Sequence, residues 1–123
     1  MKYIALCLIF ITLFGISYAK QPDNAKIKQY IYLAENYISI GELDRAYKCL
    51  QDAENLAMDK KWLAFIYERM GEIEEKKEHY TDALLYYGRS LILAKNSQYK
   101  ELENIINKKI FDIQSKNPNL LSR

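Results

Sequence analysis

The stretch that decides the fold is YIYLAENYISIGELDRAYKCLQDA, residues 30–53, because a second stretch of the same pattern follows it. The second stretch is YERMGEIEEKKEHYTDALLYYGRS, residues 67–90, and its offset from the first is 37 residues. The recurring positions are aromatic, large apolar or small: Tyr30, Leu33, Ala34, Ala46 and Leu50 return as Tyr67, Met70, Gly71, Ala83 and Tyr87. Self-similarity at a fixed period of this size indicates a repeat architecture.

Apolar residues recur at spacings of three and four in each stretch and beyond it, which predicts α-helices. The first helix starts at Asp23 and Asn24 and ends at Gly41, and a third starts after the N-cap Asp59. The others cover residues 43–56, 80–94 and 99–113. Helices joined by such short turns lie antiparallel. The predicted fold class is therefore all-α, with about five helices arranged as tandem antiparallel hairpins.

An apolar leader precedes the helices. Lys2 is followed by an uncharged run to Ala19, with the small residues Ser17 and Ala19 at its end. This order is typical of a signal peptide over residues 1–19, with cleavage before Lys20 and export to the periplasm or to the medium. The alternative is an uncleaved N-terminal anchor, which would bring the chain into contact with a membrane.

Composition excludes some partners. Half of the residues are apolar and 28% are charged, as in a globular protein, and the net charge is only +2. So small a charge does not favour nucleic acid as a partner. No glycine-rich phosphate loop, paired-cysteine motif or nucleophile elbow is present, so no enzyme and no cofactor are predicted. The abundance of lysine, asparagine and isoleucine suggests an AT-rich bacterial genome.

The two stretches resemble the tetratricopeptide repeat, a helical hairpin with aromatic, large apolar and small residues on helix A, a glycine turn, and alanines on helix B. The second stretch departs from that pattern at Glu74, at Glu78 in place of the turn glycine, and at Ser90. The resemblance implies a right-handed α-solenoid over residues 20–114, with repeats at 27–60 and 64–97, a capping helix at 99–114 and a flexible tail at 115–123. A helical bundle with accidental periodicity is the alternative.

The resemblance also implies a function, since proteins of this family hold a peptide or helix of another protein in a groove lined by helix A. Mapped onto this chain, the groove consists of Lys28, Ile31, Glu35, Ile38, Phe65, Glu68, Glu72, Glu75 and Lys76. These residues predict an acidic groove with a few apolar contact positions, suited to a basic or mixed apolar segment. The chain is thus expected to be an exported adaptor, or a subunit of an envelope complex, whose partner is another protein.

Two other functions are open. Tyr32, Tyr47, Tyr86 and Tyr99 are candidates for a second surface, through which the chain would form a homo-oligomer and act as a structural protein. Glu68, Glu72, Glu75 and His79 step by four, three and four, so one continuous helix would align them as a metal or acid/base site requires. The absence of a second histidine argues against that metal-dependent enzyme.

Overall fold

The computed structural model describes residues 23–121, and over these residues the chain is all-α. The elements are α2 (Asn24–Ser39), α3 (Leu43–Leu56), α4 (Lys60–Lys76), α5 (Tyr80–Asn96), α6 (Lys100–Lys116) and a 3-10 turn, η1 (Pro118–Leu121). The predicted fold class and the five predicted helices are confirmed. The predicted leader lies outside the described residues. None of the helices within residues 23–121 combines the length and the apolar character that a membrane-spanning helix requires.

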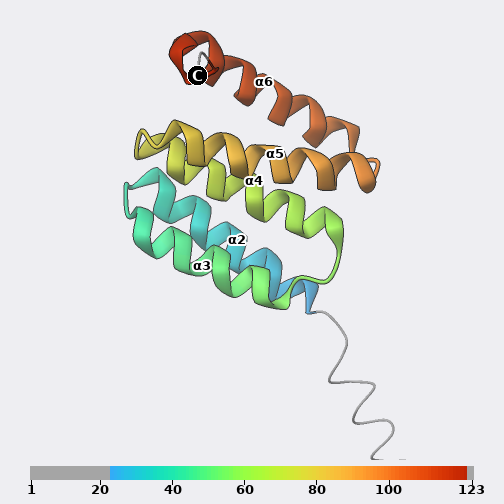
Figure 1. Ribbon diagram of the computed structural model, residues 1–123. Helices are drawn as coiled ribbons and strands as arrows, with labels where there is room; N and C mark the ends of the chain where they lie inside the picture. Colours follow the sequence, from blue (N-terminus) through green and yellow to red (C-terminus); the bar gives the residue numbers. More distant parts are fainter. Residues whose placement is uncertain (1–22, 122–123) are drawn as a thin grey trace, which may run out of the picture.

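The helices are stacked as two hairpins and a final single helix. The α2–α3 hairpin, the α4–α5 hairpin and α6 follow one another along the molecule (Figure 1). The first core is shared by α2, α3 and α4 and contains Ile27, Ile31, Ala34, Ile38, Ala46, Leu50, Ala53, Ile66, Met70 and Ile73. The second core is shared by α4, α5 and α6 and contains Ala64, Ala83, Tyr87, Ala94, Leu102, Ile106 and Ile113. Helix α4 therefore contributes one face to each core and joins the two hairpins.

Three turns have the same geometry. Gly41, Glu78 and Gln98 have positive φ angles of 80°, 64° and 58° and follow α2, α4 and α5. At each turn the next amide donates to the carbonyl five residues back, for example Glu42 N to Tyr37 O at 2.9 Å and His79 N to Glu74 O at 2.9 Å. This is the Schellman pattern, in which glycine is the least strained residue. The glutamate that replaces the turn glycine at position 78 thus adopts the conformation of the glycine.

The hairpin α4–α5 depends on small residues where its helices approach each other. A Cβ atom on Gly71 would lie 2.6 Å from Cε1 of Tyr87, whose ring is fully buried. Ser90, which stands in place of the expected alanine, is buried and donates its hydroxyl hydrogen to the carbonyl of Ala64. The hydroxyl therefore bonds a helix carbonyl while adding only one oxygen atom to the side chain of an alanine.

Residues 115–121, the described part of the predicted tail over residues 115–123, are mostly in regular structure. Helix α6 continues to Lys116, and η1 follows it. Leu120 of η1 is partly buried against the second core, and the side-chain amide of Asn117 donates to Ile113 O at 3.0 Å. These contacts hold residues 115–120 against the end of α6, because the aperiodic sequence still supplies one apolar side chain and one helix-capping amide.

Candidate partner-binding groove

Helices α2, α4 and α6 line one face of the molecule, which we call the groove. Three cavities open along it, of about 580 Å³ and 210 Å³ between α2 and α4, and of about 310 Å³ between α4 and α6. Eight of the nine predicted residues line them: Lys28, Ile31, Glu35, Ile38, Phe65, Glu72, Glu75 and Lys76. The ninth, Glu68, lies beneath the surface with an exposed fraction of 2%. Their role in binding a partner stays a prediction.

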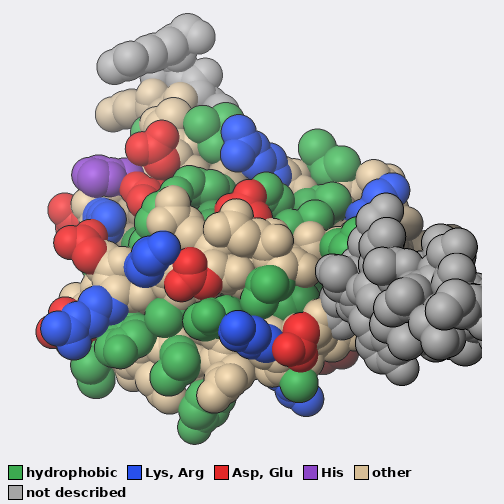
Figure 2. All heavy atoms as spheres, turned by 90° about the horizontal axis from the view of Figure 1, so that it is seen from below, with side chains coloured by type: hydrophobic (Ala, Val, Ile, Leu, Met, Phe, Trp, Pro, Cys, Tyr) green, Lys and Arg blue, Asp and Glu red, His purple; other side chains and the backbone are tan. Residues whose placement is uncertain are grey.

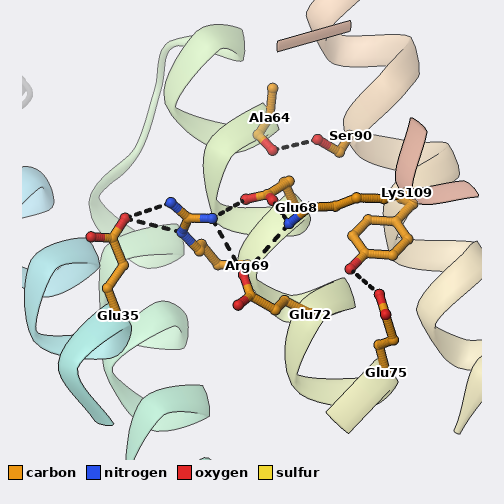
Figure 3. A network of polar contacts seen from close by, with 9 residues as sticks. Glu35, Ala64, Glu68, Arg69, Glu72, Glu75, Ser90 and Lys109 are labelled. Carbon is orange, nitrogen blue, oxygen red and sulfur yellow. Dashed lines mark hydrogen bonds and ion pairs between the residues drawn. The ribbon is translucent and has the colours of Figure 1, made fainter. Parts of the chain in front are cut away.

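A network of ion pairs crosses the middle of the groove (Figure 3). Arg69 of α4 donates from Nη2 and Nε to Oε1 of Glu35 on α2, at 2.7 and 3.0 Å. Its Nη1 atom lies 2.8 Å from Glu68 and 3.3 Å from Glu72. On the other side, Lys109 of α6 pairs with Glu68 and lies 3.6 Å from Oε2 of Glu72. The network therefore ties α2 and α6 to the central helix α4.

The charges in the network nearly cancel. Three carboxylates face two cations, and burial of Glu68 is tolerated because it is paired on both sides. Burial alone would lower the pKa of Arg69, but the carboxylates of Glu68, Glu35 and Glu72 outweigh it and raise that pKa. The remaining groove glutamate, Glu75, accepts a hydrogen bond of 2.9 Å from the hydroxyl of Tyr87. Every predicted groove glutamate therefore has a partner inside the protein, although the hydrogen bond to Glu75 leaves its negative charge in place.

The 580 Å³ cavity has mainly apolar walls. Ile31 and Tyr32 of α2 form one side, Trp62 and Phe65 of α4 form the other, and Tyr99 closes the end. The ring of Phe65 lies 6.2 Å from that of Trp62 and 5.4 Å from that of Tyr99, both tilted. Tilted aromatic pairs at these distances attract each other, so the wall is built before any ligand arrives. An apolar cavity with polar groups at its rim is the usual form of a binding site.

The four tyrosines predicted for a second surface fall into two places. Tyr32 and Tyr99 line the 580 Å³ cavity, and Tyr32 is 63% exposed. Tyr47 of α3 and Tyr86 of α5 are partly buried, and their hydroxyl groups are 3.2 Å apart. The ring of Tyr86 also stacks on that of Tyr67 at 6.3 Å. The hydrogen bond to Tyr47 and burial raise the pKa of Tyr86. Because α3 belongs to the first hairpin and α5 to the second, Tyr47 and Tyr86 form a contact between the two hairpins.

The predicted alignment of Glu68, Glu72, Glu75 and His79 does not occur. Helix α4 ends at Lys76, and the chain turns at Glu78, so that His79 becomes the N-cap of α5. His79 Nδ1 lies 2.9 Å from Oε2 of Glu74 instead. Within residues 23–121, the cluster whose ligand atoms approach within 4.8 Å of one another is Glu74, His79 and Asp82. Two of these three are exposed, and such groups are common on surfaces without an ion.

Sequence reasoning missed four residues that shape the groove: Arg69, Lys109, Trp62 and Tyr99. Arg69 and Lys109 find their partners 34 and 41 residues away, on other helices. Trp62 and Tyr99 lie at the starts of α4 and α6, where the repeat comparison assigns no groove position. The apolar periodicity of both segments placed them on helix faces, but only the stacking of the hairpins brings them to one cavity.

Outside the groove, exposed apolar side chains are distributed over several helices: Leu33 on α2, Leu85 and Ile92 on α5, and Ile105 and Phe111 on α6. The end of the molecule formed by α2 and α3 shows apolar side chains interspersed with charged ones (Figure 2). The chain was also compared with known proteins: no family model, no curated protein and no solved structure matches it.

Proposed function

We propose that the chain is an exported protein–protein interaction module of the tetratricopeptide type, an adaptor or a subunit of an envelope complex. In this proposal a segment of the partner lies in the groove of α2, α4 and α6. The observation that carries it is the 580 Å³ aromatic cavity, which opens on the face where the repeat pattern places helix A residues. Tandem hairpins, a repeat offset of 37 residues and three Schellman turns support the family assignment.

Position-specific crosslinking tests the groove. A photoreactive phenylalanine is placed at Tyr32, which is exposed and lines the cavity, or at Leu85, which is 60% exposed on α5 and lines no part of the groove. The proposal expects a partner to crosslink from position 32 and not from position 85. Crosslinking from both positions with equal yield would show that the groove is not the binding surface.

Substitution within the cavity is the second part of the test. Phe65→Ala removes a ring that contacts Trp62 and Tyr99 and is expected to abolish the crosslink from position 32. Because Phe65 also packs against both cores, the variant is first shown by circular dichroism to be folded at the assay temperature. If a folded Phe65→Ala variant crosslinks the same partner with the same yield, the groove assignment is wrong.

Export is tested by the N-terminal sequence of the purified protein. The proposal expects Lys20 as the first residue of protein recovered from outside the cytoplasm. Protein that still begins at Met1 and sediments with membranes would support the anchored alternative instead.

A further inference from the structure

The charges at the rim of the 580 Å³ cavity are not balanced. Its ionisable lining residues are Lys28, Glu35, Asp59, Lys61 and Arg69. Both carboxylates are engaged, since Glu35 pairs with Arg69 and Asp59 accepts a hydrogen bond of 2.9 Å from the backbone amide of Lys61. Among residues 23–121, neither Lys28 nor Lys61 has a carboxylate oxygen within 4.0 Å. The charge available at the rim is therefore positive.

The first turns of the two helices that wall the cavity carry lysines in place of acidic residues. Within residues 23–121, α3, α5 and α6 each have an acidic residue in the first turn, whereas α2 and α4 have none. Lys60 and Lys61 occupy the first turn of α4, and Lys26 that of α2. A lysine at the N-terminus of a helix opposes the helix dipole, and the N-cap carboxylates of Asp23 and Asp59 already meet part of that dipole. The attraction for an acidic ligand therefore comes from the lysines and not from uncapped helix ends.

The aromatic walls do not make the cavity a site for cations. An ammonium group can bind over an aromatic ring, but Lys61 Nζ already lies 4.4 Å from the centroid of the Tyr99 ring. A second cation would meet this charge and that of Lys28. The aromatic walls are therefore expected to contact an uncharged apolar group.

We infer that the cavity receives one bulky apolar side chain, such as phenylalanine or leucine, from a partner segment whose neighbouring residues are aspartate or glutamate. Lys28 and Lys61 contact the acidic neighbours, and Trp62, Phe65 and Tyr99 contact the apolar side chain. This inference rests on the proposed function and names the chemistry of its partner. The acidic neighbours differ from the basic or mixed apolar segment that the sequence predicts.

Tryptophan fluorescence provides a direct assay, because Trp62 is the single tryptophan of the chain and lines the cavity. The protein is purified from cells that express the whole 123-residue sequence. Three acetylated and amidated peptides are compared: Gly-Asp-Glu-Phe-Glu-Asp-Gly, its lysine version Gly-Lys-Lys-Phe-Lys-Lys-Gly, and the anchorless Gly-Asp-Glu-Ala-Glu-Asp-Gly. A fourth peptide repeats the first with a free C-terminal carboxylate.

The acidic phenylalanine peptide is expected to change Trp62 emission and to bind about tenfold more tightly than the lysine and alanine peptides. The ratio of its affinity to that of the lysine peptide should decrease as salt is added, because exposed charges are screened beyond about 10 Å at 0.1 M ionic strength. Equal or tighter binding of the lysine peptide overturns the inference, and so does the absence of an emission change with any peptide at millimolar concentration. Binding only by the free-acid peptide overturns it too, since the ligand would then be a chain end.

Charge reversal locates the contact. Lys28→Glu and Lys61→Glu are each expected to weaken binding of the acidic peptide about threefold to tenfold, because each reversal removes an exposed ion pair and adds a repulsion of similar size. The matched control is Lys108→Glu, on the exposed face of α6, which should change affinity less than about twofold. If the control weakens binding as much as the rim variants, the contact is not at the cavity. Crosslinking from position 32 does not depend on the sign of the partner's charges, so the proposed function can stand when this inference fails.

Discussion

The buried carboxylate of Glu68 makes the stability of the groove depend on one lysine of α6. Glu68 is 2% exposed and is paired with Arg69 and Lys109, whose side chain is 27% exposed. Lys109→Met keeps most of the aliphatic chain and removes the ammonium group. Removing one partner of a buried ion pair costs about 3–5 kcal/mol, but Arg69 still pairs with Glu68 and water reaches Lys109. We therefore expect the free energy of unfolding to fall by about 2 kcal/mol.

Urea unfolding followed by circular dichroism measures this change. Lys108→Met is the matched control, because Lys108 is the exposed neighbour of Lys109 and should stay within about 0.5 kcal/mol of the parent protein. In thermal unfolding, a loss of about 2 kcal/mol corresponds to roughly 8–16 °C for a domain of this size. The double variant Glu68→Gln/Lys109→Met should lose less than the two single losses added together, by about 1 kcal/mol or more.

Two results would refute this reasoning. One is a loss for Lys109→Met no larger than that for Lys108→Met, which would mean that Arg69 alone satisfies Glu68. The other is strict additivity in the double variant, which would mean that the two side chains do not stabilise each other.

Three further predictions concern the turns and the buried tyrosine. Glu78→Gly should raise the free energy of unfolding by about 0.5–1 kcal/mol, because glycine accepts a positive φ angle. For the same reason, Gly41→Ala should lower the free energy of unfolding by about 1 kcal/mol. A urea midpoint equal to that of the parent protein would contradict either prediction. Gly71→Ala should cost about 1–3 kcal/mol, since its methyl group meets the ring of Tyr87, and an unchanged melting temperature would contradict this. Burial and the bond to Glu75 raise the pKa of Tyr87 above its ordinary 10.0. The folded chain thus keeps a proton that the unfolded chain loses, so stability is fully present below pH 10 and falls above it. Tyr87→Phe should make that alkaline fall shallower, and an equally steep fall would contradict the assignment.

The fold could be predicted because its determinants are local. Ala34, Ala46 and Ala83, which the repeat comparison places at close helix contacts, are all fully buried. Asp59 caps α4 as its position before the apolar run predicts, with its carboxylate accepting from the amide of Lys61. Residue size and hydrogen-bonding capacity decide such features within a few positions of the chain. The same reasoning finds Gly41 and fails at Glu78 and Gln98, because a glutamate or glutamine at a left-handed position has no signature in the sequence.

The charges of the groove could not be predicted in the same way. The repeat mapping places Glu35 and Glu68 correctly on α2 and α4, but their partners are determined by how each helix is rotated against its neighbour. Arg69, next to Glu68 in the chain, reaches across to α2 because its side chain is long. The terminal position of a repeat also matters: Met70 is buried between hairpins, while the equivalent Leu33 is 38% exposed because no hairpin precedes α2 in the described part of the chain.

Local sequence and helix packing together give four glutamates of the second repeat a partner within the protein. Glu68 and Glu72 bind cations from α4 and α6, Glu74 pairs with His79, and Glu75 accepts a hydrogen bond from Tyr87, while Glu78 is exposed at the turn. Because these carboxylates already have partners within the protein, the lysines that have no carboxylate partner in the described residues remain exposed at the aromatic cavity. Under the proposed function, the acidic residues of a bound segment would lie near Lys28 and Lys61, beside the apolar side chain that enters the cavity.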